Sequence, residues 1–199
     1  MKPLRIAPRN VLHALMIGLF YPAVLGAIFY SLMDFLTSSS WSLEAALSLL
    51  VSLGILLHFT IDYVEIAAAH RDYTSVMFLI DIGVLFFLFL AFDRLNYPAG
   101  PPAYGQVGIA LSLVYILYVL YDLLGMGGRR YQYKAALSAL ACALLFASTA
   151  MAGLGVFGLL VLLAIGSARN IWMMRRERET PEQARAEEFS KDSALGTTD

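Results

Sequence analysis

Long apolar runs place the strongest constraint on how this chain can fold. Six stretches of about 20 residues are mostly apolar, and polar, glycine-rich or basic segments separate them. A helix of about 20 residues rises about 30 Å, which matches the hydrocarbon core of a bilayer. The sequence therefore predicts six transmembrane helices, at about 11–36, 41–68, 74–92, 105–124, 135–151 and 154–174.

The composition supports a membrane protein and argues against a soluble domain. Of the 199 residues, 59% are hydrophobic and 15% are charged, and the mean hydropathy is +0.69. A soluble domain is closer to half apolar and about a quarter charged. The long continuous runs also differ from the short alternating segments of a transmembrane β-barrel. We therefore expect an all-α integral membrane protein, a helix bundle whose first partner is the lipid bilayer.

The first apolar run resembles a secretory signal but is too long for one. Basic residues precede it, and the segment "VLGA" ending at Ala27 has the small residues of a cleavage site. The run nevertheless extends from Val11 to Leu36, whereas the apolar core of a signal peptide has about 7–15 residues. We therefore expect this run to be kept as the first span.

The basic residues predict which ends of the spans face the cytoplasm. Lysine and arginine accumulate in cytoplasmic loops. The N-terminus, the second and fourth loops and the tail hold 13 of the 14 basic residues, with Arg169 counted in the tail, and the other loops hold only Arg94. This alternation predicts six spans with both termini in the cytoplasm, in an inner (plasma) membrane of bacterial type.

One transmembrane domain, residues 1–174, precedes a segment of different character. Residues 175–199 have too little apolar content to fold alone. Thr180, Pro181 and Gln183 fit a helix start with proline at the first helical position. We expect a cytoplasmic tail that is disordered or partly helical. It is either solvated or a docking peptide for a cytoplasmic partner.

Ionisable residues within the spans are the main candidates for a functional site. His58, Asp62 and Glu65 follow the spacing i, i+4 and i+7, so they share one face of the second span. Asp81 lies in the third span, with no polar residue for one turn before it or three turns after it. Counting about 1.5 Å per residue from the span ends puts His58, Asp62 and Asp81 at similar depths. A charge at mid-bilayer costs about 2.5–3.5 kcal/mol, so such residues face the bundle interior or water.

The fourth span adds polar groups to the same half of the bundle. Gly108, Ser112, Tyr115 and Asp122 trace one face of it, and Tyr118 lies beside that face. Asp122 is about 5 Å from the predicted cytoplasmic edge by the same count. The candidates for binding an ion, a proton or a substrate are therefore His58, Asp62, Glu65, Asp81, Tyr115, Tyr118 and Asp122.

Two interpretations of these polar residues remain open. Neighbouring carboxylates and a histidine can take up and release a proton, or bind a small cation or an amine, because burial and nearby charges control their protonation. Alternatively, Asp81 bonds across helices or pairs with Arg71 or His58, and only holds the helices together. Arg71, Arg129 and Arg130 are candidates for binding anions or lipid headgroups near the cytoplasmic mouth.

Several function classes lack their motifs. The chain has no GxSxG elbow, HExxH motif or P-loop. Its one cysteine, Cys142, permits neither a disulfide within the chain nor a cysteine zinc site. Three histidines, His13, His58 and His70, are too few for the histidine-rich site of a membrane di-iron enzyme. We assign no catalytic residue and expect no cofactor, metal or nucleic-acid partner.

Three functions of different classes fit these features. The first is ion- or proton-coupled transport or channel activity, with Asp81 as the carrier. The second is a non-catalytic membrane subunit that assembles a larger complex, or a homo-oligomer, through the small residues of the fifth and sixth spans and through the tail. The third is a lipid-active membrane enzyme that uses Asp62 and Asp122 as acid and base. An enzyme is the least favoured of the three.

Overall fold

The computed structural model describes residues 11–38, 42–68, 73–95, 103–124, 130–153 and 155–172. This part of the chain is helical and contains no strand. Six of its helices are long and apolar enough to cross a membrane. The prediction of an all-α chain with six such helices is confirmed.

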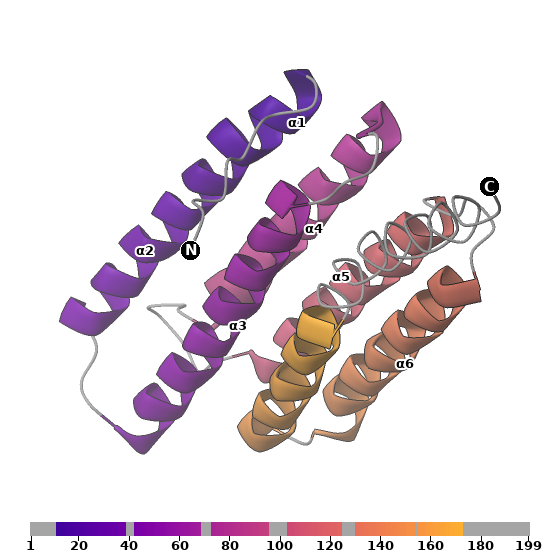
Figure 1. Ribbon diagram of the computed structural model, residues 1–199. Coiled ribbons are helices and arrows are strands. Elements are labelled where there is room, and N and C mark those ends of the chain that lie inside the picture. The colour runs from indigo at the N-terminus through magenta and orange to yellow at the C-terminus, as the bar shows by residue number, and fades with distance from the viewer. Residues whose placement is uncertain are drawn as a thin grey trace, which may run out of the picture.

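The six long helices run up and down along one common direction, each antiparallel to the one before it, with α1, η1 and α2 in line as the first of them (Figure 1). Side-chain caps define two of the helix starts. The Ser42 hydroxyl accepts a hydrogen bond from the Ala45 N–H at 3.1 Å, and the Thr74 hydroxyl accepts one from the Met77 N–H at 3.3 Å. The elements are α1 (Val11–Leu15), η1 (Met16–Phe20), α2 (Tyr21–Ser38), α3 (Leu43–Ala68), α4 (Ser75–Asp93), α5 (Tyr104–Leu124), α6 (Arg130–Ala152) and a final helix, Gly155–Trp172.

A π-helical turn, η1, interrupts the first long helix between α1 and α2. Pro22 gives the physical reason, because proline has no N–H and its ring clashes with the carbonyl four residues back. In the wider turn, the N–H of Tyr21 bonds to the carbonyl five residues back. With the same spacing of five residues, the Ile17 carbonyl would pair with the N–H of residue 22, which is a proline and has none. It accepts a hydrogen bond from the Tyr63 hydroxyl of α3 instead, at 3.4 Å.

Two glycines form the turn between α6 and the final helix. Gly153 and Gly155 have φ of 63° and 62°, in the left-handed region that glycine adopts without steric cost. The sequence left open whether this segment is a tight turn or a kink in one long helix. The structure contains a turn here, so α6 and the final helix, Gly155–Trp172, are two antiparallel helices.

Small residues let the helices approach closely. A Cβ atom added at Gly108 of α5 would lie 3.0 Å from the Phe146 carbonyl oxygen of α6. A Cβ added at Gly54 of α3 would lie 3.1 Å from the Leu163 side chain of the final helix. Glycine therefore brings backbones together in this bundle, as it does in membrane helices.

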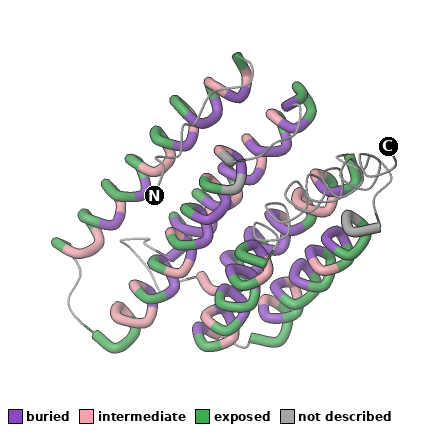
Figure 2. Tube along the Cα trace, viewed as in Figure 1, coloured by how far each residue is buried: buried purple, intermediate pink, exposed green. Residues whose placement is uncertain are grey.

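The outer face of the bundle is apolar, while the polar side chains treated below are buried. Leu137 and Leu144 on α6, and Phe157 and Val161 on the final helix, are exposed. Exposed positions follow the outward faces of the helices, and buried positions follow the inward ones (Figure 2). A soluble monomer rarely exposes large apolar side chains along the outward faces of all its helices. Together with the six apolar helices, this surface suggests a multi-pass membrane protein.

Candidate functional site

A buried carboxylate joins three helices at the centre of the site. Asp62 of α3 is only 3% exposed. Its Oδ1 accepts a hydrogen bond from the Tyr118 hydroxyl of α5 at 2.7 Å, and its Oδ2 accepts one from the Tyr21 hydroxyl of α2. Hydrogen bonds of this kind offset the cost of removing a carboxyl group from water. Asp62 thus links α2, α3 and α5.

Tyr21 lies where the first long helix changes from π-helical to α-helical. Tyr21 is the first residue after η1, and its side chain is 1% exposed. Its ring packs against the rings of Phe59 and Tyr63, with centroids 5.1 and 5.2 Å apart. These two ring contacts with α3 help to place the hydroxyl at Asp62. No sequence motif identified Tyr21 as a site residue, because its role depends on a contact with a residue 41 positions away.

His58 lies one turn before Asp62 on the same face of α3 and is 1% exposed. Its ring packs against those of Tyr115 and Tyr118, with centroids 5.6 and 6.2 Å apart. Among the described residues, neither ring nitrogen of His58 has a hydrogen-bond partner. A neutral imidazole carries one donor and one acceptor, and leaving such a buried group unbonded costs about 1–3 kcal/mol. We call Tyr21, His58, Asp62 and Tyr118 the Asp62 cluster.

Tyr115 forms one wall of the Asp62 cluster. It is 1% exposed and stacks on Phe146 of α6, with ring centroids 5.5 Å apart. A Cβ added at Gly166 of the final helix would lie 1.9 Å from the Tyr115 hydroxyl oxygen. The absence of a side chain at Gly166 therefore makes room for Tyr115 and fixes its position beside His58.

A buried ion pair lies next to the Asp62 cluster. The Arg169 guanidinium of the final helix donates to Asp122 Oδ2 of α5 at 3.0 Å, and each side chain is 9% exposed. Arg169 also donates to the Ala135 carbonyl and the Ser138 hydroxyl of α6, at 3.0 and 3.1 Å. Its Cζ lies 5.8 Å from the centroid of the Tyr118 ring. Arg169 therefore joins α5, α6 and the final helix and contacts the cluster through Tyr118.

Arg169 is a site residue that sequence analysis did not identify. Arg169 was counted with the basic residues of the tail as a mark of orientation, whereas in the structure its side chain is 9% exposed and pairs with Asp122. Ser167 and Asn170 flank it and are also buried. Three polar residues together in an otherwise apolar span were the available signal, because a buried cation near a span end needs an anion at matching depth.

Asp81 does not join the Asp62 cluster by a hydrogen bond. It is 3% exposed and accepts a hydrogen bond from the Tyr73 hydroxyl, just before α4 begins. The alternative pairing with His58 is wrong, since no hydrogen-bond partner of His58 lies in the described part of the chain. Burial, and then the adjacent Asp81 carboxyl, raise the pKa of Tyr73 well above its ordinary value, so this hydroxyl stays a donor.

The remaining predicted residues give no further geometry. Glu65 belongs to α3 and Arg130 begins α6, but their side chains lie outside the described part of the structure. Arg71 and Arg129 lie outside the described residues altogether, as does the tail after residue 172. Within the described ranges, no group of three or more His, Cys, Asp or Glu side chains could hold a metal ion.

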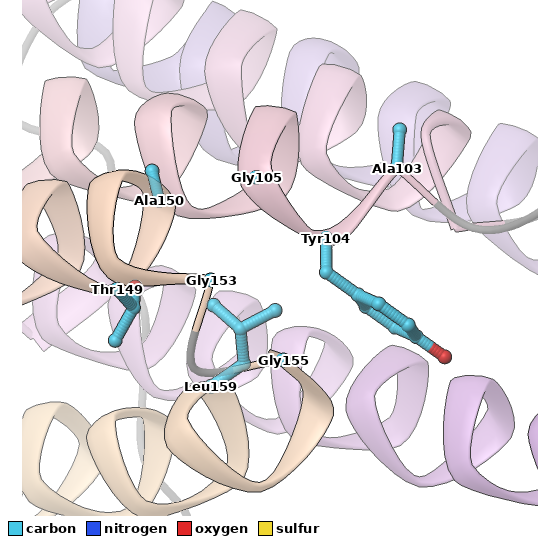
Figure 3. Close-up of a pocket in the computed structure, with 8 residues that line it drawn as sticks. All are labelled: Ala103, Tyr104, Gly105, Thr149, Ala150, Gly153, Gly155 and Leu159. Atoms are coloured by element: carbon cyan, nitrogen blue, oxygen red, sulfur yellow. The ribbon is translucent and has the colours of Figure 1, made fainter.

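A groove of about 330 Å³ lies where α5 begins and α6 ends. The turn glycines form part of its wall (Figure 3). It is separate from the Asp62 cluster, since no residue of the cluster lines it. Its lining residues are Ala103, Tyr104, Gly105, Thr149, Ala150, Gly153, Gly155 and Leu159.

Comparison with protein-family models, curated proteins and solved structures gives no match for this chain. Its function is therefore argued from the geometry of its own residues.

Proposed function

We propose that the protein moves protons, or a small cation together with protons, across a membrane through the Asp62 cluster. One observation carries the proposal. Asp62 is a carboxyl group that is 3% exposed and accepts hydrogen bonds from tyrosines on two other helices. Ionisable residues inside membrane bundles are costly and mark ion or proton pathways.

The bonding of Asp62 couples its protonation to the arrangement of the helices. An ionised carboxyl group only accepts hydrogen bonds, whereas a protonated one carries a donor as well. Adding a proton to Asp62 turns one of its oxygens into a donor and weakens it as an acceptor, which changes its bonding to the two tyrosines. Because Tyr21 and Tyr118 belong to α2 and α5, that local change acts on the contact between helices. Such a coupling is what a transporter needs to change access to a buried site.

The membrane placement is part of the proposal. The six apolar helices would span an inner (plasma) membrane of bacterial type with both termini in the cytoplasm, as the basic residues indicate. The ion pair of Asp122 and Arg169 would then lie toward the cytoplasmic face, since α5 ends at Leu124 and the final helix at Trp172.

The carrier role moves from Asp81 to Asp62 in this proposal. Asp81 bonds to Tyr73, eight residues away along the chain, so its protonation acts mainly on the start of its own helix. Asp62 is bonded to two distant helices instead. A contribution from Asp81 stays a prediction, for which Asp81→Asn is the corresponding variant.

The experiment is proton flux into liposomes that contain the purified protein and a pH-sensitive dye. Asp62→Asn keeps the side-chain shape but removes the titrating group, so we expect its flux to fall to that of protein-free liposomes. Asp34→Asn is the matched control, because Asp34 is an exposed carboxylate on α2, and it should keep the parent flux. Equal flux from the parent and Asp62→Asn would refute the role of Asp62.

The groove of Figure 3 favours a second candidate function, a non-catalytic membrane subunit. Its small side chains would let a helix of a partner approach closely. Native mass spectrometry of gently purified protein tests this candidate. A second polypeptide that copurifies in fixed ratio would support it, provided that the polypeptide is lost with Ala150→Leu and still present with Asp62→Asn. A third candidate, the lipid-active enzyme, has no such observation in its favour, because an ion pair with Arg169 occupies Asp122.

A further inference from the structure

We propose that His58 is the second proton-carrying group of the site and exchanges a proton with Asp62 during transport. The inference rests on the proposed function and adds a second residue and a step to it. In the step, the Asp62 carboxyl releases a proton and becomes a carboxylate, while the His58 imidazole accepts that proton and becomes an imidazolium. The pair is uncharged before the step and has no net charge after it.

The first support is that His58 is buried without a hydrogen bond. It is 1% exposed, and both Nδ1 and Nε2 lack a partner within the described part of the chain. Buried polar groups are nearly always bonded, and an exception calls for a reason. Aromatic rings of Tyr115 and Tyr118 flank the imidazole, so a phenylalanine would satisfy the packing as well. Packing alone therefore does not account for a histidine here.

The second support is that one residue contacts both partners of the exchange. The Tyr118 hydroxyl donates to Asp62 Oδ1 at 2.7 Å, and the Tyr118 ring lies against the His58 ring. His58 and Asp62 are four residues apart on α3, about 6 Å along the helix axis. When Asp62 holds the proton, its carboxyl can donate to the Tyr118 oxygen, and the Tyr118 hydroxyl is released to donate to the imidazole. Tyr118 gives up one proton and receives another, so it ends unchanged.

The charged and titratable groups around His58 are compatible with this step. From α3 it faces Asp62, and from α5 it faces Tyr115 and Tyr118. From the final helix, Arg169 lies 5.8 Å from the centroid of the Tyr118 ring, and Asp122 pairs with it at 3.0 Å. From α2, Tyr21 bonds to Asp62. The carboxylate that the step creates at Asp62 lies one turn from the imidazolium on the same face of α3, so the two opposite charges form on neighbouring side chains.

The test uses two variants of the full chain, His58→Phe and His58→Gln, in dye-loaded liposomes. Flux is measured at several pH values with a constant pH difference across the membrane. A step that protonates the His58 imidazole makes the flux depend on pH. We therefore expect the flux of both variants to fall to that of protein-free liposomes, with no pH dependence beyond theirs. Ser52→Ala is the control, because the Ser52 hydroxyl of α3 is also buried without a partner in the described residues, and it should keep the parent profile.

Thermal unfolding in detergent separates a transport role from a structural one. His58→Phe keeps a ring of similar shape and removes both unbonded nitrogens, so its Tm should be at least that of the parent while its flux is lost. Loss of flux with a matching fall in Tm in both variants would mean that His58 is structural, and would overturn the exchange.

Failure of this inference is distinct from failure of the proposed function. If both His58 variants keep the parent flux and pH profile while Asp62→Asn abolishes flux, the exchange is wrong and the proposed function stands. If liposomes with the parent protein take up protons no faster than empty ones, the proposed function fails, and the exchange fails with it.

Discussion

At the scale of single residues, Tyr118 contacts three groups of different chemistry. Its hydroxyl donates to the Asp62 carboxyl, its ring lies beside His58, and the Arg169 guanidinium lies over its ring. A cation near the face of an aromatic ring is attracted by about 0.5–2 kcal/mol, more when the site is desolvated. Tyr118 therefore connects the ion pair of Arg169 with the carboxyl group proposed to carry the proton.

The ion pair of Arg169 and Asp122 gives the prediction at this scale. Arg169→Leu leaves Asp122 buried without its counter-ion, so we expect a loss of about 3–5 kcal/mol in the free energy of unfolding. Combining it with Asp122→Leu removes the unpaired charge, so the double variant should recover most of that loss. Equilibrium unfolding in detergent of the parent, both single variants and the double variant measures the coupling. Additive losses would contradict a direct pair.

At the scale of elements, two helices serve the site through an irregularity or a small residue. The π-turn before α2 brings Tyr21 to Asp62, and Pro22 accounts for that turn. Gly166 leaves space for the Tyr115 hydroxyl at the wall of the Asp62 cluster. π-helical turns such as η1 occur often at functional sites. Apolar residues make up most of each helix, while the π-turn and Gly166 position polar side chains of the site.

The turn before the final helix gives the prediction at the element scale. Gly153→Ala puts a side chain on a residue with φ of 63°, and the left-handed conformation costs such a residue about 1–2 kcal/mol. Nothing lies within 4 Å of the added Cβ, so the expected loss of stability comes from the backbone alone. Gly26→Ala is the control. Its Cβ also meets nothing within 4 Å, but it lies inside α2, where alanine is favoured over glycine by about 1 kcal/mol.

Unfolding of these two variants in the same detergent should therefore shift in opposite directions. Gly153→Ala should lower the midpoint, and Gly26→Ala should leave it unchanged or raise it. A midpoint for Gly153→Ala at or above that of the parent would show that the turn does not hold its left-handed conformation.

At the scale of the whole molecule, the bundle exposes apolar side chains and buries its ionisable groups inside a mainly apolar core, an arrangement that suits a bilayer. The orientation is tested with single cysteines in a Cys142→Ala background. Leu43 and Lys134 are exposed at opposite ends of the bundle. A membrane-impermeant maleimide should label Leu43→Cys in intact cells and Lys134→Cys only after the cells are opened. The reverse pattern would overturn the proposed orientation.

The sequence alone was enough to predict six long apolar helices and the shared face of His58 and Asp62 on α3. These features depend on residues within one helix. Apolar content over about 20 residues decides whether a helix can span a membrane, and the 3.6-residue period decides which of its side chains share a face.

Only the tertiary structure decided the partners of the polar residues. Tyr21 reaches Asp62 across 41 positions, and Arg169 reaches Asp122 across 47. Such pairs depend on which helices are neighbours and on how each is rotated about its axis. An apolar helix surface can face lipid or another apolar helix at similar cost. Apolar contacts therefore determine the choice of neighbour and the rotation of each helix only loosely. Close contacts set them instead, such as the one between Gly166 and Tyr115, and these exist only when the helices pack together.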